Sequence, residues 1–264
     1  MKKLSAILFT IIMTVCTSSC SDEKGCTDQN AINFNPLAKE DDGSCRFVEG
    51  EIPVPDNYIP HISRSGAALI AIKAINTVPA GPLGTVDHNL NYAVAAFNDT
   101  TGSNLITAGT VTCEGTELSL RTGTVYTYDV TGNESGISFS FPIEWKATGD
   151  AWPAFEVSAN NAFPEIGNIT SGNIELNEDY TLTTSSASGS DSLLYAIFGQ
   201  EGMVQVLTSG SNTSYTFSAS DLRQVGKGTA VVQVTGLSYA TENLDRRDYL
   251  LVSQKVRSRV VEVQ

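Results

Sequence analysis

Short runs of apolar or alternating residues recur from about residue 66 to the end of the chain, separated by clusters of Gly, Asn, Asp, Ser and Thr. The runs of the first half cover residues 67–75, 92–97, 106–113, 117–120, 125–130 and 137–145. Those of the second half cover residues 180–184, 192–198, 203–207, 214–217, 230–235 and 249–263. Because most of these runs are short and rich in β-branched and aromatic residues, they predict strands. The alanine-rich run 67–75 would fit a helix by itself, but Gly66 before it and the strands after it favour a strand.

A break at residues 153–164 separates the two sets of runs. Each set has six runs, which suits a single immunoglobulin-like β-sandwich of roughly 100 residues. We therefore expect an all-β protein with two tandem immunoglobulin-like β-sandwich domains, at residues 61–158 and 159–264.

The N-terminal residues carry the pattern of an export signal. Lys2 and Lys3 precede an apolar stretch that is too short to span a bilayer with any margin, which predicts a signal peptide over residues 1–19. Residues 17–20 read Thr-Ser-Ser-Cys and resemble the lipobox of bacterial lipoproteins, although that family prefers an aliphatic residue where this chain has Thr17. The resemblance implies that Cys20 is lipidated and anchors the protein in a membrane. Secretion without an anchor is the alternative.

The four residues after Cys20 read Ser-Asp-Glu-Lys and resemble the signals that send Bacteroidota lipoproteins to the outer face of the outer membrane. This resemblance implies a lipid-anchored protein of the outer membrane that is exposed at the cell surface. A solvated tether is the plainer interpretation of this short acidic stretch.

Cys26 and Cys45 enclose 18 residues of an acidic loop. In an exported chain we expect them to form a disulfide, so that residues 20–45 comprise the anchor and a closed loop. Cys113 is then the odd thiol, and we expect it to be a small buried hydrophobic residue. Residues 46–60 contain three prolines and predict a semi-rigid linker.

The loop resembles a module of Bacteroidota surface and secreted proteins with the pattern C-T-D-x-x-A-x-N-[YF]-N-P-x-A-x-x-D-D-G-S-C. The resemblance implies a compartment rather than an activity. Six residues of the loop offer the oxygen ligands that Ca²⁺ prefers: Asp28, Asn30, Asn33, Asn35, Asp41 and Asp42. Their spacing does not fit an EF-hand, and turn formation by Asn and Asp is the favoured explanation. Calcium is therefore a candidate cofactor beside a purely structural interpretation.

The formal net charge is −13, which makes nucleic acid and anionic lipid headgroups poor partners. Residues 221–264 nevertheless hold seven basic residues against five acidic ones. The basic group includes Arg246, Arg247, Lys255, Arg257 and Arg259. We expect these side chains on the solvent faces and edges of the last strands, where charge opposes aggregation. Contact with an acidic partner is the alternative.

Candidate catalytic residues are few. His61 and His88 stand in neither a zinc-ligand spacing nor an evident nucleophile arrangement, so we expect ordinary loop histidines and no enzyme. Trp145 alternates with Phe139 and other apolar residues and belongs to the predicted core. Packing between the two domains is the favoured role of Trp152, and a platform for stacking on a sugar ring is the alternative.

Together these patterns favour a non-enzymatic, membrane-anchored surface lipoprotein that acts as an adhesion or interaction module toward an unknown extracellular protein or glycan. A glycan-binding accessory protein of a polysaccharide-uptake system is the alternative, and a carbohydrate-active enzyme comes third. The body also resembles uncharacterised Bacteroidota lipoproteins. Two triplets that begin at Asp99 and Asp191 resemble the D-[ST]-x acceptor sequence of Bacteroidota O-glycosylation.

Overall fold

The computed structural model describes residues 24–25, 27, 39–41, 66–80, 84–121, 124–130 and 136–264. Residues 2–55 belong to one compact unit and residues 56–264 to another. In the first unit, β1 (Lys24–Gly25) pairs in parallel with β2 (Glu40–Asp41), and Lys24 Nζ lies 3.3 Å from a carboxylate oxygen of Glu40. The predicted signal peptide, lipidated Cys20, disulfide between Cys26 and Cys45 and linker 46–60 lie outside the described residues.

The second unit is all-β, as the sequence predicts, with one short helix, α2 (Ala219–Leu222), in its described part. Its strands are, in chain order, β3 (Ala67–Pro79), β4 (Thr85–Phe97), β5 (Val111–Cys113), β6 (Thr116–Arg121), β7 (Val125–Thr127), β8 (Ile143–Ala147), β9 (Phe155–Ala159), β10 (Glu165–Ile166), β11 (Tyr180–Thr183), β12 (Ala187–Ser188), β13 (Ser192–Phe198), β14 (Met203–Ser209), β15 (Ser214–Phe217), β16 (Gly228–Leu244) and β17 (Arg247–Val263). The alanine-rich run is thus a strand, β3, and not a helix.

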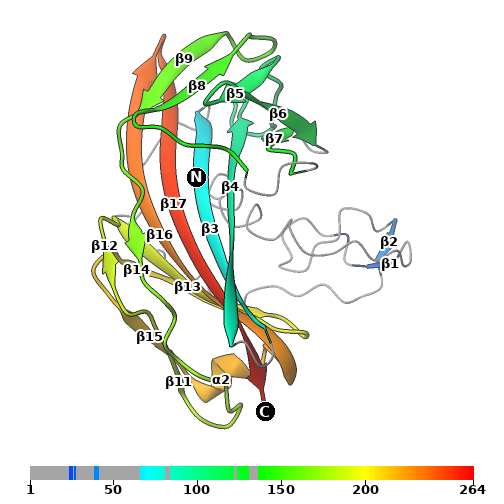
Figure 1. The fold of residues 1–264 in the computed structure, drawn as a ribbon. Coiled ribbons are helices and arrows are strands. Elements are labelled where there is room, and N and C mark those ends of the chain that lie inside the picture. Colours follow the sequence, from blue (N-terminus) through cyan, green and yellow to red (C-terminus); the bar gives the residue numbers. More distant parts are fainter. Residues whose placement is uncertain are drawn as a thin grey trace. The chain divides into compact units, whose positions relative to one another are not determined.

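One sheet of 11 strands joins both halves of this unit in the order β14-β13-β16-β17-β3-β4-β7-β6-β5-β8-β9. The long hairpins β3–β4 and β16–β17 lie at its centre, and β17 pairs in parallel with β3. Figure 1 shows β5 to β9 gathered at one end of these long strands, and β11, β15 and α2 at the other end. Two tandem immunoglobulin-like domains are therefore not confirmed, because strands from residues 61–158 and 159–264 share one sheet.

Two hydrophobic cores lie on the same face of the long strands. Paired residues of neighbouring strands point to one side of a sheet, and side chains alternate along each strand. At one end Leu69 and Leu251 pair and join the first core, which the strands from β5 to β9 complete. At the other end Ala230 and Val261 pair and join the second core, which β11 and β15 cover. Each end of the sheet thus has a sandwich-like core of its own.

The opposite face of the central strands is apolar and buried as well. Ile70 and Ile72 of β3 and Val252 of β17 point to this side and are 1 % exposed. A strand buried on both faces has an almost continuous apolar sequence instead of an alternating one. This explains why residues 67–72 resemble a buried helix in the sequence.

The structure corrects two local predictions. The break at residues 153–164 contains a strand, β9, whose residues pair with β8. His88 is exposed, but it lies on strand β4 rather than in a loop. His61 lies outside the described residues.

Candidate functional site

A polar belt separates the two cores on their shared face of the sheet. We define this belt by Thr77 and the charged side chains of β3, β4 and β17 that point to that face between the cores: Lys73, Asp87, Lys255, Arg257 and Arg259. The three cations of β17 stand at alternate positions, so they lie on one side of the strand, about 7 Å apart. Charged groups thus gather in the part of the face between the two cores.

Residues 160–171 cross this belt and are called the crossing segment below. Asn161 Nδ2 donates to the carbonyl oxygens of Ser238, at 2.8 Å, and Leu251, at 3.4 Å, while Ser253 Oγ donates to the carbonyl of Asn161. Further along, Lys73 Nζ lies 4.3 Å from the centre of the Phe163 ring. These contacts fix the segment where the sequence predicted a junction between domains.

Gly236 of β16 gives the crossing segment room to lie close to the sheet. A methyl group on Gly236 would come within 2.7 Å of Ser190, 2.8 Å of Ile166 and 2.9 Å of Pro164. Such distances are shorter than van der Waals contact. The absence of a side chain at this position therefore sets the depth of the segment.

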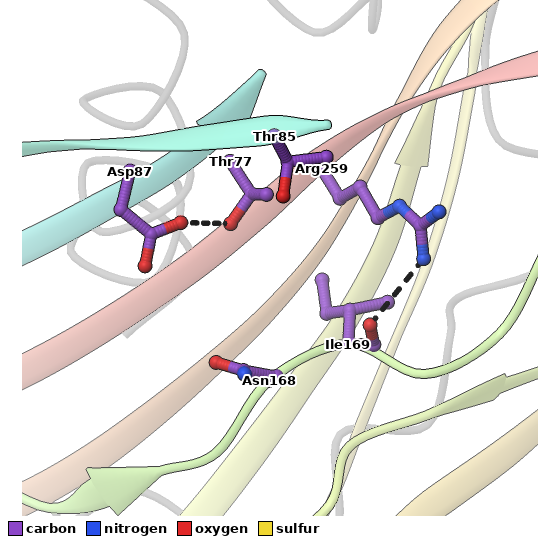
Figure 2. A pocket seen from close by; sticks show the side chains of 6 residues that line it. All are labelled: Thr77, Thr85, Asp87, Asn168, Ile169 and Arg259. Carbon is purple, nitrogen blue, oxygen red and sulfur yellow. Dashed lines mark hydrogen bonds between the residues drawn. The ribbon is translucent and has the colours of Figure 1, made fainter. Parts of the chain in front are cut away.

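Beyond Gly236 the crossing segment and the β3–β4 hairpin enclose a pocket of about 340 Å³. Its lining residues come from β3, β4, the crossing segment and β17: Thr77, Thr85, Asp87, Asn168, Ile169 and Arg259. Figure 2 shows Asp87 beside Thr77, and the guanidinium of Arg259 beside the backbone of Ile169. Five of these six described side chains are polar, and they offer hydrogen bonds rather than an apolar surface.

Arg257 holds two walls of this pocket together. Its Nη1 donates to Asp87 Oδ2 at 2.7 Å, and its Nη2 donates to Asn168 Oδ1 at 2.5 Å. The Arg257 side chain is 11 % exposed, whereas that of Asp87 is 44 % exposed. The guanidinium of Arg257, a residue of β17, thereby connects the β3–β4 hairpin to the crossing segment.

Both carboxylate oxygens of Asp87 accept a hydrogen bond from a neighbouring side chain. Its Oδ1 accepts a hydrogen bond of 2.6 Å from Thr77 Oγ1, and its Oδ2 accepts the one from Arg257. The hydrogen bond from Thr77 and the hydrogen bond and charge of Arg257 lower the pKa of Asp87, against the opposing effect of burial. Asp87 is therefore an ionised internal partner for Arg257.

Arg259 is the second cation of the pocket, and it has no carboxylate within ion-pair distance among the described residues. Its Nη1 donates to the carbonyl oxygens of Ser171, at 3.2 Å, and Ile169, at 3.5 Å. A guanidinium has five N–H donors in a planar fork, and the other nitrogens of Arg259 make no hydrogen bond within the part of the chain that the structure describes. Among the described residues, the pocket thus has one positive charge that no carboxylate compensates.

The rest of the belt is also rich in positive charge. Burial lowers the pKa of Lys255; the carboxylate of Glu165 raises it, and the charges of Lys73 and Arg257 lower it further. Four cations of the belt face two nearby carboxylates, those of Asp87 and Glu165. In a chain with a net charge of −13 this belt is a local exception.

The basic residues near the C-terminus are only partly where the sequence predicted them. Arg246 is exposed in the turn before β17, but Arg257 is buried and Lys255 and Arg259 are half-buried. The physical reason is that β17 is a central strand with β16 on one side and β3 on the other, rather than an edge. One sequence signal could have located these residues: Lys255, Arg257 and Arg259 alternate with Val256 and its neighbours, so they share one face.

Trp152 is not a sugar platform. It is 0 % exposed in the first core, its Nε1 donates to Tyr249 Oη at 3.1 Å, and the Arg247 guanidinium lies 4.4 Å from its ring centre. A ring with no exposed face cannot stack on a sugar, so the prediction of a glycan contact at Trp152 is wrong. Trp145 is also buried in the first core, as predicted.

The candidate calcium ligands cannot be placed as a set. Asp28, Asn30, Asn33, Asn35 and Asp42 lie outside the described residues, and of Asp41 only the backbone pairing in β2 is described. Within the described ranges, no three or more His, Cys, Asp or Glu residues come together in a way that could hold a metal ion.

Three smaller predictions have clear outcomes. Cys113 is a buried free thiol, and burial together with the charge of Glu114 raises its pKa, which agrees with a hydrophobic role. Thr100 of the first possible glycosylation triplet is exposed in a turn, whereas Ser192 of the second is fully buried in β13. Ser192 is therefore inaccessible to a modifying enzyme in the folded protein.

In comparisons with known proteins, no protein-family model matches this chain and no curated protein matches it. Within the part of the chain that the structure describes, no helix is both long and apolar enough to cross a membrane.

Proposed function

We propose that this protein is a non-enzymatic surface lipoprotein that binds an extracellular ligand through the pocket beside Arg259. The pocket is the observation that supports a binding role most strongly, because polar groups from distant parts of the chain are fixed around one cavity. Its volume of about 340 Å³ falls in the range of small-ligand sites. The sheet supplies the rigid frame that an interaction module needs.

A glycan is a better match for this pocket than a protein segment. Thr77 and Thr85 offer hydroxyls, Asn168 an amide, and Arg259 a guanidinium, and Ile169 is the only apolar residue among the described residues that line the pocket. These groups both donate and accept hydrogen bonds, as the hydroxyls of a sugar require. We therefore favour the glycan-binding role, with adhesion to a protein as the second candidate.

The engagement of Asp87 supports the non-enzymatic part of the proposal. Glycoside hydrolysis uses two carboxyl groups, one of which must deliver a proton. Asp87 is the single carboxylate among the lining residues that the structure describes, and Thr77 and Arg257 favour its ionised form. This pocket therefore supports binding better than turnover.

Blocking the pocket tests the binding role. Thr85→Tyr should fill the pocket and abolish binding of the purified protein to its best ligand on an array of glycans and extracellular proteins. Thr241→Tyr, at an exposed position of β16 outside the pocket, should bind like the wild type. Equal binding by the wild type and Thr85→Tyr would contradict a role for this pocket.

The anchor and the N-terminal loop are separate proposals. We infer from the lipobox resemblance that Cys20 carries acyl chains and holds the protein at the outer membrane of a Bacteroidota-like cell, since several chains anchor more stably than one. Mass spectrometry of the mature N-terminus should find a lipidated Cys20, and an unmodified residue there would refute the anchor.

Peptide mapping without reduction should find the disulfide between Cys26 and Cys45. Calorimetry with Ca²⁺ decides between metal binding and a structural role for Asp28 and the other loop residues.

A further inference from the structure

We propose that the pocket selects a sugar carrying a single negative charge on a carboxylate, such as a uronic acid unit, and that Arg259 binds this carboxylate. This inference rests on the proposed function, because it names the ligand class of the same pocket. Its basis is the way in which charges are distributed around the cavity.

Asp87 and Arg257 compensate each other's charges at the pocket. Asp87 and Arg257 form an ion pair of 2.7 Å, and Thr77 occupies the second oxygen of Asp87. Their charges cancel, so this pair contributes shape and hydrogen-bonding groups to the pocket but little net charge. Arg259 is left as the charged group that faces the cavity without a carboxylate partner among the described residues.

The guanidinium of Arg259 is oriented so that it can bind a ligand. Two backbone carbonyls, of Ile169 and Ser171, accept hydrogen bonds from its Nη1 and thereby fix the plane of the guanidinium. The donors on the other nitrogens remain for a ligand. A planar fork of N–H groups matches the two oxygens of a carboxylate, and such charge-assisted pairs are the stronger class of hydrogen bonds.

The volume of the pocket and the charge around it limit the size and the charge of the ligand. A cavity of about 340 Å³ accommodates a ligand of roughly monosaccharide size. The guanidinium of Arg259 balances one negative charge of a ligand, and the net charge of −13 of the protein disfavours the approach of ligands that carry more than one. A uronic acid therefore fits the size and the charge of the pocket better than a phosphorylated sugar, which carries nearly two negative charges at neutral pH. Hydroxyls of the same sugar ring would bond to Thr85 and Asn168, which also line the cavity.

The test uses matched pairs of probes that differ in the charged group. Galacturonic, glucuronic and mannuronic acid, each with one carboxylate, are titrated into the purified protein beside galactose, glucose and mannose, with galactose 6-phosphate as a third arm. We expect at least one of the three acids to bind roughly tenfold to a hundredfold more tightly than its neutral counterpart and than the phosphate.

Variants of Arg259 assign the selectivity to this residue. Arg259→Gln keeps hydrogen-bond donors but loses the charge, and should remove the preference for the uronate while thermal unfolding confirms that the protein is folded. Arg259→Lys keeps the charge without the fork and should retain part of the preference. Arg246→Gln, an exposed arginine in the turn before β17, is the matched control and should bind like the wild type.

The possible failures are distinct. If the acidic and neutral sugars bind equally, or if Arg259→Gln keeps the full preference, the carboxylate assignment is overturned. Binding of the phosphorylated sugar in preference to the uronate would also overturn it. If a neutral glycan or a protein binds and only Thr85→Tyr abolishes that binding, the proposed function stands without this inference. If no ligand of any kind responds to Thr85→Tyr, both fail.

Discussion

At the scale of single residues, the pocket depends on a buried arginine and its carboxylate partner. Arg257 contacts Asp87 on one wall and Asn168 on the other, so its two hydrogen bonds join the two walls of the pocket. The Arg257 side chain is largely buried while Asp87 is exposed to solvent on one side. Loss of either charge therefore affects stability and pocket geometry together.

The ionisation of Asp87 gives a prediction for pH. Because its pKa is lowered in the folded protein, ionised Asp87 stabilises the fold above the unfolded-state pKa of about 3.9, and this contribution is lost as the pH falls through the lower folded-state pKa. Asp87→Asn should therefore lower the Tm by about 2–4 °C between about pH 5 and about pH 8, and the gap should close below about pH 4. Glu178→Gln, at an exposed turn, is the control for thermal unfolding across this range. A gap that is unchanged at low pH would contradict the role of Asp87.

Trp152 gives a second prediction at this scale. Trp152→Ala should lower the free energy of unfolding by about 3–5 kcal/mol, because it removes a wholly buried ring that contacts Tyr249 and Phe97. Phe141→Ala, at a side chain that is 65 % exposed, should change stability by less than about 0.5 kcal/mol. Urea denaturation measures both. A Trp152→Ala variant as stable as the wild type would refute the core assignment.

Some of these residue roles were predictable and others were not. Trp145 and Cys113 lie in apolar runs, so their burial followed from the local pattern. Thr77 and Asn168 are ordinary polar residues in ordinary contexts, and their role comes only from the strands and the segment that bring them together. A pocket assembled from three distant parts of the chain, namely the β3–β4 hairpin, the crossing segment and β17, leaves no motif.

At the scale of elements, the crossing segment determines where the pocket lies. It follows β9, passes Gly236 and delivers Asn168 to Arg257. The path of the crossing segment depends on Gly236 of β16, where there is no side chain to block it. Substitution of Gly236 therefore tests whether the segment positions the pocket.

Gly236→Ala should destabilise the protein by about 1–3 kcal/mol, because the added methyl group would collide with Pro164, Ile166 and Ser190. It should also weaken ligand binding, since Asn168 lies on the displaced segment. Gly172→Ala is the matched control, because no atom lies within 4 Å of the position that its methyl group would take. Denaturation and ligand titration of both variants provide the measurement. Equal behaviour of the two variants would show that the segment is not held at this depth.

The existence of most strands was predictable, whereas their partners were not. The runs 192–198 and 214–217 match β13 and β15 in full, because β-branched and aromatic residues between turn residues are a local signal. No local signal tells that Tyr249 pairs with Ala67 in a parallel ladder. The predicted boundary between residues 158 and 159 failed to anticipate this pairing, since pairing between the two halves is set by long-range packing.

At the scale of the whole molecule, the shared sheet predicts cooperative unfolding of residues 56–264. β17 lies between β16 of its own half and β3 of the other half, so neither half keeps its sheet when the other unfolds. Scanning calorimetry should show one transition for this unit, with equal calorimetric and van't Hoff enthalpies. Two resolved transitions for residues 56–264 would instead support independent tandem domains.

The most direct measurement of the central claim locates the ligand on the protein. Backbone amide chemical shifts are recorded by NMR while the uronic acid that binds most tightly is titrated into the purified protein. We predict that the largest shifts fall on the pocket residues Thr77, Thr85, Asn168 and Arg259, and that Arg259→Gln needs roughly tenfold or more of the acid to reach them. Shifts that cluster away from this pocket, or that persist unchanged in Arg259→Gln, would contradict the account.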